Sequence, residues 1–342
     1  MALKIIVLAN SAKLGGAENI AKQCHRDIIK KFGGEMCRLT YLHRSDIYNF
    51  KFQRLLKLVD TFKSLILLIN QLRKPYQYII ISHMHQANLI SRICGILFSN
   101  VRVYNFIHSN FELKSYSLRY ILTDRLIEKY IFVSHASYEA QRQYFDQNKA
   151  TVIQNEVDNQ RFFYNEAKRI STRQLLKIKT TERVFLIAGR LESEKKVTEI
   201  VDTWIKFKID HKLIIVGDGS LKNKLKKRSL SFETKIQVLD TVDNIEDYYN
   251  ACDVLISNSS DESFGLVILE SLNCGCTVFS AAGPHTTLFL KYKKFKIYQN
   301  LTELLHLISV LGTELKYDLN YRKKYSKPGV ETEATIIKAI EI

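Results

Sequence analysis

The sequence predicts an α/β protein with two domains, each built on a parallel β-sheet. Its 342 residues exceed the size of one ordinary domain, so two domains are the simplest expectation. The hydrophobic content of 46% and the charged content of 25% are those of packed globular domains. Short apolar runs recur along the chain with helical patterns between them, which is typical of buried parallel strands connected by helices.

Each apolar run of four to eight residues is assigned to a strand, and each longer amphipathic pattern to a helix. Strands are expected at 4–9, 36–42, 78–82, 101–107, 130–134, 183–188, 212–217, 235–239, 253–257 and 276–280. Helices are expected at 20–29, 51–74, 221–228, 243–251 and 266–273. The polar, charged stretch near 163–180 separates a first domain, 1–163, from a second, 164–322, and a final helix is expected at 323–342.

Cysteine usage and apolar run length indicate the compartment. The six cysteines show neither a Cys-x-x-Cys pair nor zinc spacing, so reduced thiols in a cytoplasmic protein are expected. No apolar run approaches the roughly 18 residues of a membrane-spanning helix. Residues 1–10 turn polar too soon for a signal peptide and are assigned to a first buried strand.

The net charge of +16 is concentrated in the first half of the chain. Residues 1–165 carry 23 Lys or Arg and 12 Asp or Glu, about +11, and the rest carries about +5. Such asymmetry favours an anionic partner, namely a membrane surface, a phosphate-linked substrate or nucleic acid. The basic helix 221–228 is interpreted as a solvated face, and nucleic acid is disfavoured because no recognition module accompanies the charge.

The stretch 252–286 is the most informative part of the chain. A buried strand is followed by a polar loop, and ligands of open parallel sheets bind at such loops. The loop carries Glu262 and the following helix carries Glu270. Eight helical steps between them would span about 12 Å, the distance from a sugar across a diphosphate to a ribose. An exposed helix with ordinary acids would show the same spacing.

Two motifs in the second half resemble a known family. Glu262-x7-Glu270, with Ser-Phe-Gly after the first acid, and Gly-Arg190-Leu-x-x-x-Lys195 are similar to elements of retaining GT-B glycosyltransferases of family 4, the glycosyl transferases group 1. The resemblance is to enzymes of bacterial surface-polysaccharide synthesis. A strand-exit loop with solvated charges remains the alternative for the Arg190 motif.

The resemblance assigns roles to these residues. It implies that Glu262 lies by the donor sugar, Glu270 holds the ribose hydroxyls, and Arg190 and Lys195 hold the diphosphate. The amides at Phe264, Gly265 and Leu266 would receive donor oxygens, because the first amides of a helix are unpaired. Cations suit a departing diphosphate, which gains negative charge as it leaves.

The first half adds two weaker matches. Gly15-Gly16 follows the first strand and resembles the family's Gly-Gly-Ala-Glu turn, whose backbone would face the donor diphosphate; a plain turn is the alternative. His108 ends a strand, as does the family's histidine beside the sugar; a histidine that caps a strand end is the alternative. His83-Met-His85 suits zinc poorly, and no metal site is expected.

Four positions depart from the family pattern. Glu156 and Lys196 stand where the family has glycine, Thr277 where it has proline, and His285 where it often has glutamate. A glutamate disfavours the positive φ that a glycine allows, so the turn at Glu156 is in question. Lys196 leaves open which lysine reaches the phosphate.

The resemblance implies two Rossmann-like domains that face a cleft, with acceptor bound by the first and donor by the second. It also implies transfer of a hexosyl or N-acetylhexosaminyl group from a UDP- or GDP-linked sugar, with retention, without a metal and without a cofactor. The basic first domain, including helix 51–74, suggests a polyprenyl-diphosphate-linked saccharide acceptor and a peripheral position on the inner face of the plasma membrane. A solvated face of a core-packed helix is the favoured interpretation of 51–74 itself, and it is compatible with lipid contact along a basic rim.

Two other classes of function stay open at this stage. One is a sugar-nucleotide epimerase or a phosphorylase on the same architecture. The other is a catalytically silent accessory protein that binds a sugar nucleotide, which the four departures would explain.

Overall fold

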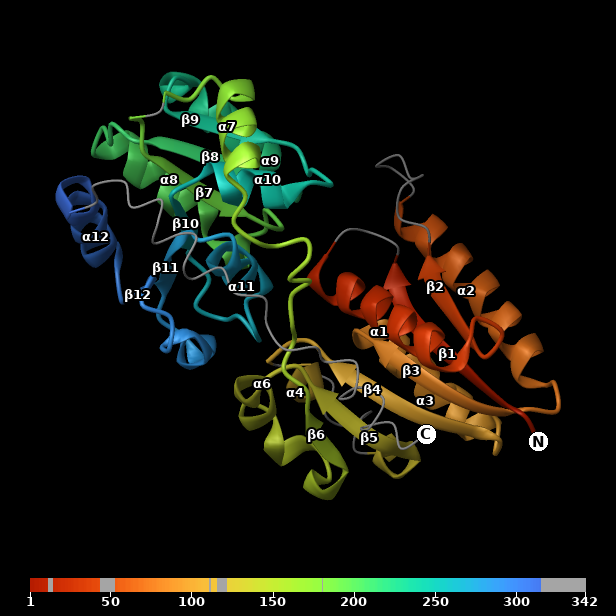
Figure 1. Cartoon of the computed structure of the whole chain (residues 1–342). Coiled ribbons are helices and arrows are strands. Elements are labelled where there is room, and N and C mark those ends of the chain that lie inside the picture. The colour runs from red at the N-terminus through yellow and green to blue at the C-terminus, as the bar shows by residue number, and fades with distance from the viewer. Residues whose placement is uncertain (12–14, 44–52, 111, 116–121, 180, 315–342) are drawn as a thin grey trace. The chain divides into compact units, whose positions relative to one another are not determined.

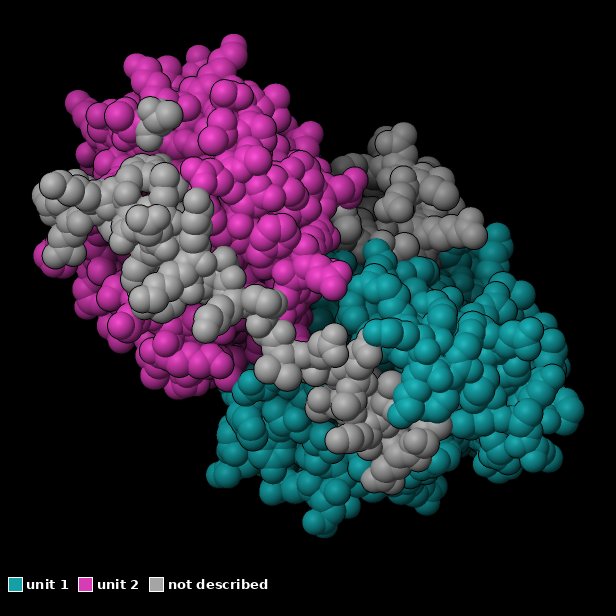
Figure 2. All heavy atoms as spheres, in the orientation of Figure 1, with its two compact units in different colours: residues 1–155, 331–342 teal, residues 156–330 magenta. Residues whose placement is uncertain are grey.

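The computed structural model describes residues 1–11, 15–43, 53–110, 112–115, 122–179 and 181–314. These residues form two compact units, one within Met1–Asn155 and the other within Glu156–Val330 (Figure 2). The division falls eight residues before the predicted end of the first domain. The predicted final helix at 323–342 lies outside the described residues.

Unit 1, within Met1–Asn155, contains a six-stranded sheet in the order β2-β1-β3-β4-β5-β6, and every pairing is parallel (Figure 1). Its strands are β1 (Leu3–Ser11), β2 (Cys37–His43), β3 (Gln77–His83), β4 (Val101–Ile107), β5 (Ile127–Phe132) and β6 (Ala150–Val152). Its α-helices are α1 (Gly16–Phe32), α2 (Gln53–Leu72), α3 (His85–Leu97), α4 (Glu112–Ser115) and α6 (His135–Glu139). Single 3-10 turns are η1 (Asp124–Leu126), η2 (Arg142–Tyr144) and η3 (Gln147–Lys149).

Helices cover both faces of this sheet, which explains the continuous apolar strands. Residues 5–9 of β1 are all buried, and successive side chains point to opposite faces. Ile6 and Leu8 pack in one cluster with Leu68 of α2 and Cys94 of α3. The helix α1, which connects β1 to the strand on its other side, covers the opposite face, because right-handed crossovers in opposite directions place their helices on opposite faces.

Unit 2, within Glu156–Val330, contains a second parallel sheet in the order β12-β11-β10-β7-β8-β9. Its strands are β7 (Val184–Ala188), β8 (Lys212–Val216), β9 (Ile236–Leu239), β10 (Val254–Ser257), β11 (Thr277–Ala281) and β12 (Phe295–Tyr298). Its α-helices are α7 (Glu166–Leu175), α8 (Val197–Lys206), α9 (Lys222–Ser229), α10 (Ile245–Ala251), α11 (Leu266–Asn273) and α12 (Leu301–Glu314). The 3-10 segments are η4 (Ser193–Lys195), η5 (Leu230–Phe232) and η6 (Pro284–Phe289).

Two buried clusters lie on the two faces of the second sheet. Phe185 of β7 packs in a cluster with Trp204 of α8 and Leu304 of α12. Its neighbour Leu186 packs in the other cluster with Ile268 of α11. Successive side chains of β7 thus pack against helices on opposite faces of the sheet. Both predicted parallel sheets are confirmed, each covered by helices as in other α/β folds.

A buried ion pair fastens α7 to the start of β10. Arg169 donates to Asp253 at 2.7 Å and also to the carbonyls of residues 250–252, and both side chains of the pair are at most 7% exposed. The other carboxylate oxygen of Asp253 accepts the Val184 amide at 3.0 Å. One acid thus aligns α7, β7 and β10.

The predicted elements are confirmed in kind, with ends shifted by a few residues. The strands β6 and β12 and six helices were not assigned from the sequence, namely α3, α4, α6, α7, α8 and α12. Of these, α7 lies within the stretch 163–180 that was interpreted as the boundary between the domains. Within the described residues, no helix combines the length and the apolar content that spanning a bilayer requires. All six cysteines lie within the described residues and are buried, and no two of them form a disulfide.

Candidate functional site

The central strands β7 and β10 lie side by side, with Val254 paired to Phe185. From β7 the chain continues outward to β8 and β9, and from β10 it continues in the opposite direction to β11 and β12. The loops that leave the carboxyl ends of β7 and β10 therefore flank the point where the strand order reverses. Ligands of open parallel sheets bind at this point.

These two loops bring Lys195 and Glu262 together. Lys195 Nζ forms an ion pair with Glu262 Oε1, although 67 residues separate them in the sequence. Both side chains are partly buried, at 26% and 15% exposed. Two of the predicted site residues are thus in direct contact, and the pair reaches the surface of unit 2.

Asn258 fixes the distance between the same two loops. Its amide donates to the carbonyl of Lys196 at 3.0 Å, and its side-chain oxygen accepts the hydroxyl of Tyr298 at 2.7 Å. Asn258 is buried, as is Tyr298. Asn258 consequently holds the loop that carries Glu262 against the loop that carries Lys195.

Lys196 adopts a left-handed conformation, with φ 48° and ψ 32°. Glycine favours this region, so the backbone keeps the shape that the family's glycine would give. At the other glycine position the outcome differs, because Glu156 is not among the residues with positive φ. The Thr277 amide donates to the carbonyl of Asp253 at 3.0 Å, a bond that a proline could not make.

Backbone contacts shape the loop after β7. The Leu191 amide donates to the Asp218 carbonyl at 2.8 Å, and the Leu221 amide donates to the Leu191 carbonyl at 2.9 Å. A Cβ at Gly219 would lie 2.5 Å from the Leu191 carbonyl oxygen, so only glycine fits there. The Gly-Asp-Gly turn after β8 therefore supports the loop that carries Arg190 and Lys195.

Arg190 does not join the Lys195–Glu262 pair. Its side chain is 67% exposed and lies 3.4 Å from Glu194, one helical turn further on. The predicted cationic pair is thus split in this structure, with one member in the site and the other at the surface.

The helix α11 begins at Leu266, and Gly265 before it has φ 92°. The first intrahelical bond runs from the Ile268 amide to the Gly265 carbonyl at 3.0 Å, so the amides of residues 265–267 precede it. The estimate of about 12 Å between Glu262 and Glu270 assumed a continuous helix, and that premise was wrong, because the chain is not helical before Leu266. Phe264 is buried beneath this turn.

Glu270 lies on α11, where Tyr249 of α10 donates a hydrogen bond to Oε2 at 2.8 Å. Burial raises the pKa of Glu270 to about 7, and the Tyr249 bond and the charge of Arg161 oppose the rise. The carboxyl group therefore titrates near neutral pH. No contact between Glu270 and the Lys195–Glu262 pair is recorded in the described part of unit 2.

His285 is a buried neighbour of the acidic loop. Its Nε2 lies 3.1 Å from Ser280 Oγ, and its Nδ1 is buried with no hydrogen-bond partner among the described residues. Burial lowers the pKa of His285, and the nearby Glu262 opposes that effect. The neutral imidazole stands where the family often has glutamate, so this position adds no negative charge beside Glu262.

In unit 1, Gly15 precedes α1 in an extended conformation, and Gly16 is its first residue. A Cβ at Gly15 would lie 2.4 Å from Glu18 Oε2, and Ser11 Oγ donates to the same carboxylate at 3.2 Å. The predicted glycine turn is thus present at the carboxyl end of β1, with an acid folded back beside it.

His108 follows β4 and contacts a second histidine. His83 Nδ1 lies 3.0 Å from His108 Nε2, and the His83 ring stacks on Phe106 with 4.3 Å between ring centres. Burial lowers the pKa of both histidines, that of His108 to about 4. Both imidazoles are therefore neutral at pH 7, and a single proton joins them.

Sequence reasoning missed three partners of the predicted residues. Tyr249, Asn258 and His83 each hold a predicted site residue or its loop in place. His83 was noticed only as a poor metal ligand. In the described residues, no three His, Cys, Asp or Glu side chains are grouped as a metal site would require.

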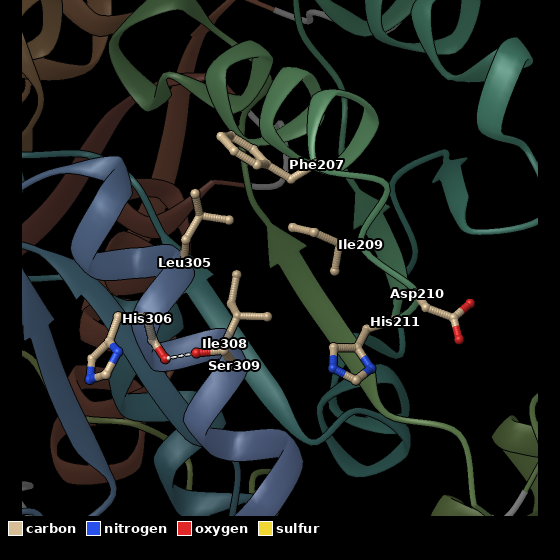
Figure 3. A pocket seen from close by; sticks show the side chains of 8 residues that line it. All are labelled: Phe207, Ile209, Asp210, His211, Leu305, His306, Ile308 and Ser309. Atoms are coloured by element: carbon tan, nitrogen blue, oxygen red, sulfur yellow. Dashed lines mark hydrogen bonds between the residues drawn. The ribbon is translucent and has the colours of Figure 1, made fainter.

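A shallow hollow of about 420 Å³ lies elsewhere on unit 2, between the end of α8 and α12 (Figure 3). Its lining residues are Phe207, Ile209, Asp210, His211, Leu305, His306, Ile308 and Ser309. None of the predicted site residues lines it. The chemistry-bearing side chains belong to the loops after β7 and β10.

Known proteins are similar to this chain mainly in unit 2, and one relative is similar over most of its length. Residues 168–316 match the family model of glycosyl transferases group 1. The UDP-Gal:α-D-GlcNAc-diphosphoundecaprenol α-1,3-galactosyltransferase of Escherichia coli is 27% identical, over 72% of this chain and 69% of the enzyme. A Campylobacter jejuni N-acetylgalactosaminyltransferase, whose name gives a diphospho-undecaprenol acceptor, is 29% identical over 38% of this chain and 34% of that enzyme.

Solved structures share the architecture of the chain. The Anabaena protein HepE in complex with UDP-glucose superposes with a TM-score of 0.74 at 18% identity, over 98% of this chain and 95% of HepE. WaaG, a glycosyltransferase involved in lipopolysaccharide biosynthesis, gives a TM-score of 0.69 at 11% identity, over 94% and 93%. Residues 168–316 are therefore similar to the glycosyl transferases group 1, and the chain has the GT-B fold.

Proposed function

We propose that this protein is a retaining glycosyltransferase that moves a hexosyl or N-acetylhexosaminyl group from a nucleotide-sugar to a lipid-linked saccharide acceptor. The observation that carries the proposal is the contact between Lys195 and Glu262 at the carboxyl ends of β7 and β10. A lysine here suits the phosphate at one end of the bond that breaks, and a glutamate suits the sugar at its other end.

Each site residue then has a definite task. Lys195 neutralises the departing diphosphate, and Glu262 accepts hydrogen bonds from the sugar hydroxyls. The unpaired amides from Gly265 onward receive donor oxygens, and the Glu270 carboxylate binds the ribose hydroxyls. The exposed side chain of Arg190 swings from Glu194 to the diphosphate, since an exposed ion pair contributes little and releases it readily.

Retention follows if the acceptor hydroxyl attacks the sugar carbon from the face that the diphosphate leaves. The sugar–phosphate bond breaks first, through an oxocarbenium-like transition state. The acceptor oxygen then bonds to that carbon, and its proton passes to an oxygen of the departing phosphate. No protein base and no metal is required in this scheme, and Lys195 with Arg190 supplies the positive charge. His108, neutral at pH 7, contributes a hydrogen bond beside the sugar.

The names of relatives guide the choice of substrates. The E. coli relative is named for UDP-galactose and a diphosphoundecaprenol-linked acceptor, and HepE was solved with UDP-glucose. We therefore place UDP-sugars ahead of GDP-sugars, and a polyprenyl-diphosphate saccharide as the acceptor, in surface-polysaccharide synthesis. The basic first half would hold the enzyme on the inner face of the plasma membrane.

A thermal-shift screen of UDP- and GDP-sugars identifies the donor. A ligand at 100 times its dissociation constant stabilises the folded state by about 2.7 kcal/mol, which is a measurable shift. Transfer to a polyprenyl-diphosphate saccharide in detergent is then followed by mass spectrometry, and the anomeric configuration of the product by NMR. An inverted product would refute the retaining mechanism.

Substitutions at the contact test the roles directly. Lys195→Met and Glu262→Gln are each expected to lower kcat/KM by about 100-fold, because each removes a charged group aimed at developing charge. The matched control is the exposed ion pair Lys226–Asp240, where Lys226→Met should leave transfer unchanged. Full activity in Lys195→Met would exclude the proposed site.

The same assays distinguish the proposed transferase from the two rival classes of function. Conversion or hydrolysis of the nucleotide-sugar without any acceptor would favour an epimerase or a phosphorylase. Donor binding without turnover on any acceptor would favour an accessory protein. Both outcomes would leave the fold unchanged and would replace the proposal.

A further inference from the structure

Two histidines lie against each other at the carboxyl edge of the first sheet. His83 is the last residue of β3 and is fully buried, and His108 directly follows β4. His83 Nδ1 lies 3.0 Å from His108 Nε2. The His83 ring stacks on Phe106, its partner across the β3–β4 pairing. The contact is therefore set by the sheet itself, and His83 has no part in the transfer scheme given above.

Backbone strain directly after His83 marks the same place. Met84 has φ 73° and ψ 159°, a region in which residues other than glycine are rarely found. Its carbonyl accepts the Asn88 amide at 2.9 Å, and the Ala87 amide donates to Asn10 Oδ1 at 2.9 Å. A single residue thus separates β3 from α3. Strain of this kind persists where surrounding contacts impose it, and it is concentrated at functional sites.

The bond between the two rings contains one proton, because burial lowers the pKa of both imidazoles and leaves both neutral at pH 7. The proton belongs either to His83 Nδ1 or to His108 Nε2, and the choice fixes the other nitrogen of each ring. If His83 Nδ1 carries it, His83 Nε2 is bare and His108 has its own proton on Nδ1. If His108 Nε2 carries it, His83 has its proton on Nε2 and His108 Nδ1 is bare.

The surroundings of His83 Nε2 favour one of these two arrangements. This nitrogen is buried and has no hydrogen-bond partner among the described residues. In the second arrangement it would be an N–H donor without an acceptor. Among buried backbone groups, an orphaned N–H is rarer than an acceptor that lacks a donor, and the same preference applied to this ring favours the first arrangement.

We propose that His83 is a positioning residue, whose Nδ1–H donates to His108 Nε2 and thereby keeps the proton of His108 on Nδ1. An oxygen of the nucleotide-sugar that contacts His108 Nδ1 then meets a hydrogen-bond donor, and this nitrogen cannot act as a base. The role rests on the proposed function, in which the departing phosphate takes the acceptor's proton. It adds the direction of the hydrogen bond that His108 makes beside the sugar.

Nitrogen-15 NMR of the full chain with labelled histidine tests the arrangement without any substrate. Protonated and bare ring nitrogens give separate signals, and those of His108 are assigned by their loss in His108→Phe. At pH 7 His108 should have a protonated Nδ1 and a bare Nε2. In His83→Leu, which lacks the donor, the proton of His108 should distribute over both nitrogens. A bare Nδ1 on His108 in wild type would overturn the proposal.

Steady-state transfer from UDP-galactose and UDP-glucose measures the effect on function. His83→Leu should lower kcat/KM about five- to tenfold, the usual size for one hydrogen bond. His83→Asn should stay within about threefold of wild type, because the asparagine amide can donate from near the place of Nδ1. The matched control is His25→Leu, at a partly buried histidine of α1 whose pKa burial also lowers, and it should leave transfer unchanged.

A double variant separates a positioning role from an independent one. In the His108→Leu background, His83→Leu should lower kcat/KM no further, because His83 acts through His108. Losses that multiply would overturn the proposal, as would an asparagine variant that is as impaired as the leucine variant. If His83→Leu does not fold, the wild-type spectrum and His83→Asn still decide.

The spectroscopic and kinetic results keep this role distinct from the proposed function. A protonated Nδ1 on His108 in a protein that transfers no sugar to any acceptor would support the His83–His108 arrangement and refute the transferase. Sugar transfer by a protein whose His108 has a bare Nδ1 would support the transferase and overturn the role of His83.

Discussion

At the scale of single residues, Glu270 shows how burial sets the conditions for a ligand site. Its carboxyl group is desolvated against α10, and the only neutral donor recorded for it is Tyr249. A pKa of about 7 means that half of the molecules carry a neutral Glu270 at neutral pH. A carboxylate accepts hydrogen bonds from two ribose hydroxyls better than a protonated acid does, so donor binding should depend on pH.

We expect the dissociation constant of a UDP-sugar to be about tenfold higher at pH 6 than at pH 8, because the ionised fraction of a group with pKa 7 changes tenfold over that range. Isothermal calorimetry at the two pH values measures it. The variant Glu270→Gln should bind weakly and equally at both. A pH dependence that survives in Glu270→Gln would assign the effect to another group.

The same shift predicts a stability effect of defined sign. The folded pKa, about 7, lies above the ordinary value of 4.5, so the folded state holds the proton more tightly than the unfolded state. Wild type should therefore lose stability as the pH rises from 4.5 to 7. Glu270→Gln, which stays neutral, should unfold at higher urea than wild type at pH 8, and the difference should disappear below pH 4.5.

Lys196 is the residue whose identity and conformation disagree. A side chain in the left-handed region costs about 1–2 kcal/mol relative to glycine. Its amine reaches Ser260 Oγ at 3.4 Å, which is too long to offset much of that cost. The lysine at this position therefore destabilises the folded state locally, and its side chain makes no contact that offsets the loss.

We expect Lys196→Gly to raise the free energy of unfolding by about 0.5–1 kcal/mol, the strain relieved less the added flexibility of glycine in the unfolded chain. Urea denaturation measures it, with Lys196→Ala as the control, since alanine keeps the strain. Destabilisation by glycine would mean that the lysine side chain matters more than its backbone.

At the scale of elements, the strands could be predicted because parallel strands buried on both faces give unbroken apolar runs, as in residues 5–9. The strands β6 and β12 were missed because they have three and four residues and partly exposed patterns. Glu262, Lys195 and Glu270 could be assigned from their motifs. Their partners could not, since Tyr249 and Asn258 reach them only through the packing of α10 and of the loop after β10.

The ion pair between Arg169 and Asp253 is an element-scale feature, because one carboxylate joins α7, β7 and β10. Asp253→Ala would leave two buried arginine side chains and the Val184 amide short of an acceptor. We expect a loss of about 3–5 kcal/mol in unfolding free energy. Asp240→Ala, at an exposed pair, should cause no measurable change in urea denaturation, and a small loss for Asp253→Ala would contradict the role of the pair.

At the scale of the whole molecule, each unit has its own buried clusters, so each can respond to a ligand by itself. The proposed donor contacts are concentrated in unit 2. A UDP-sugar at 100 times its dissociation constant should raise the calorimetric transition of unit 2 by the equivalent of about 2.7 kcal/mol. An equal rise in the transition of unit 1 would show that the Gly15-Gly16 turn shares the ligand.

The pairing of β7 with β10 also governs when the protein becomes competent during its synthesis. Partners across this pairing are 69 residues apart in the sequence, so Lys195 leaves the ribosome long before Glu262. At about 5–20 residues per second, the delay is on the order of ten seconds. Throughout that interval the nascent second unit has Lys195 without Glu262, and a chain that terminates before β10 cannot form the proposed nucleotide-sugar site.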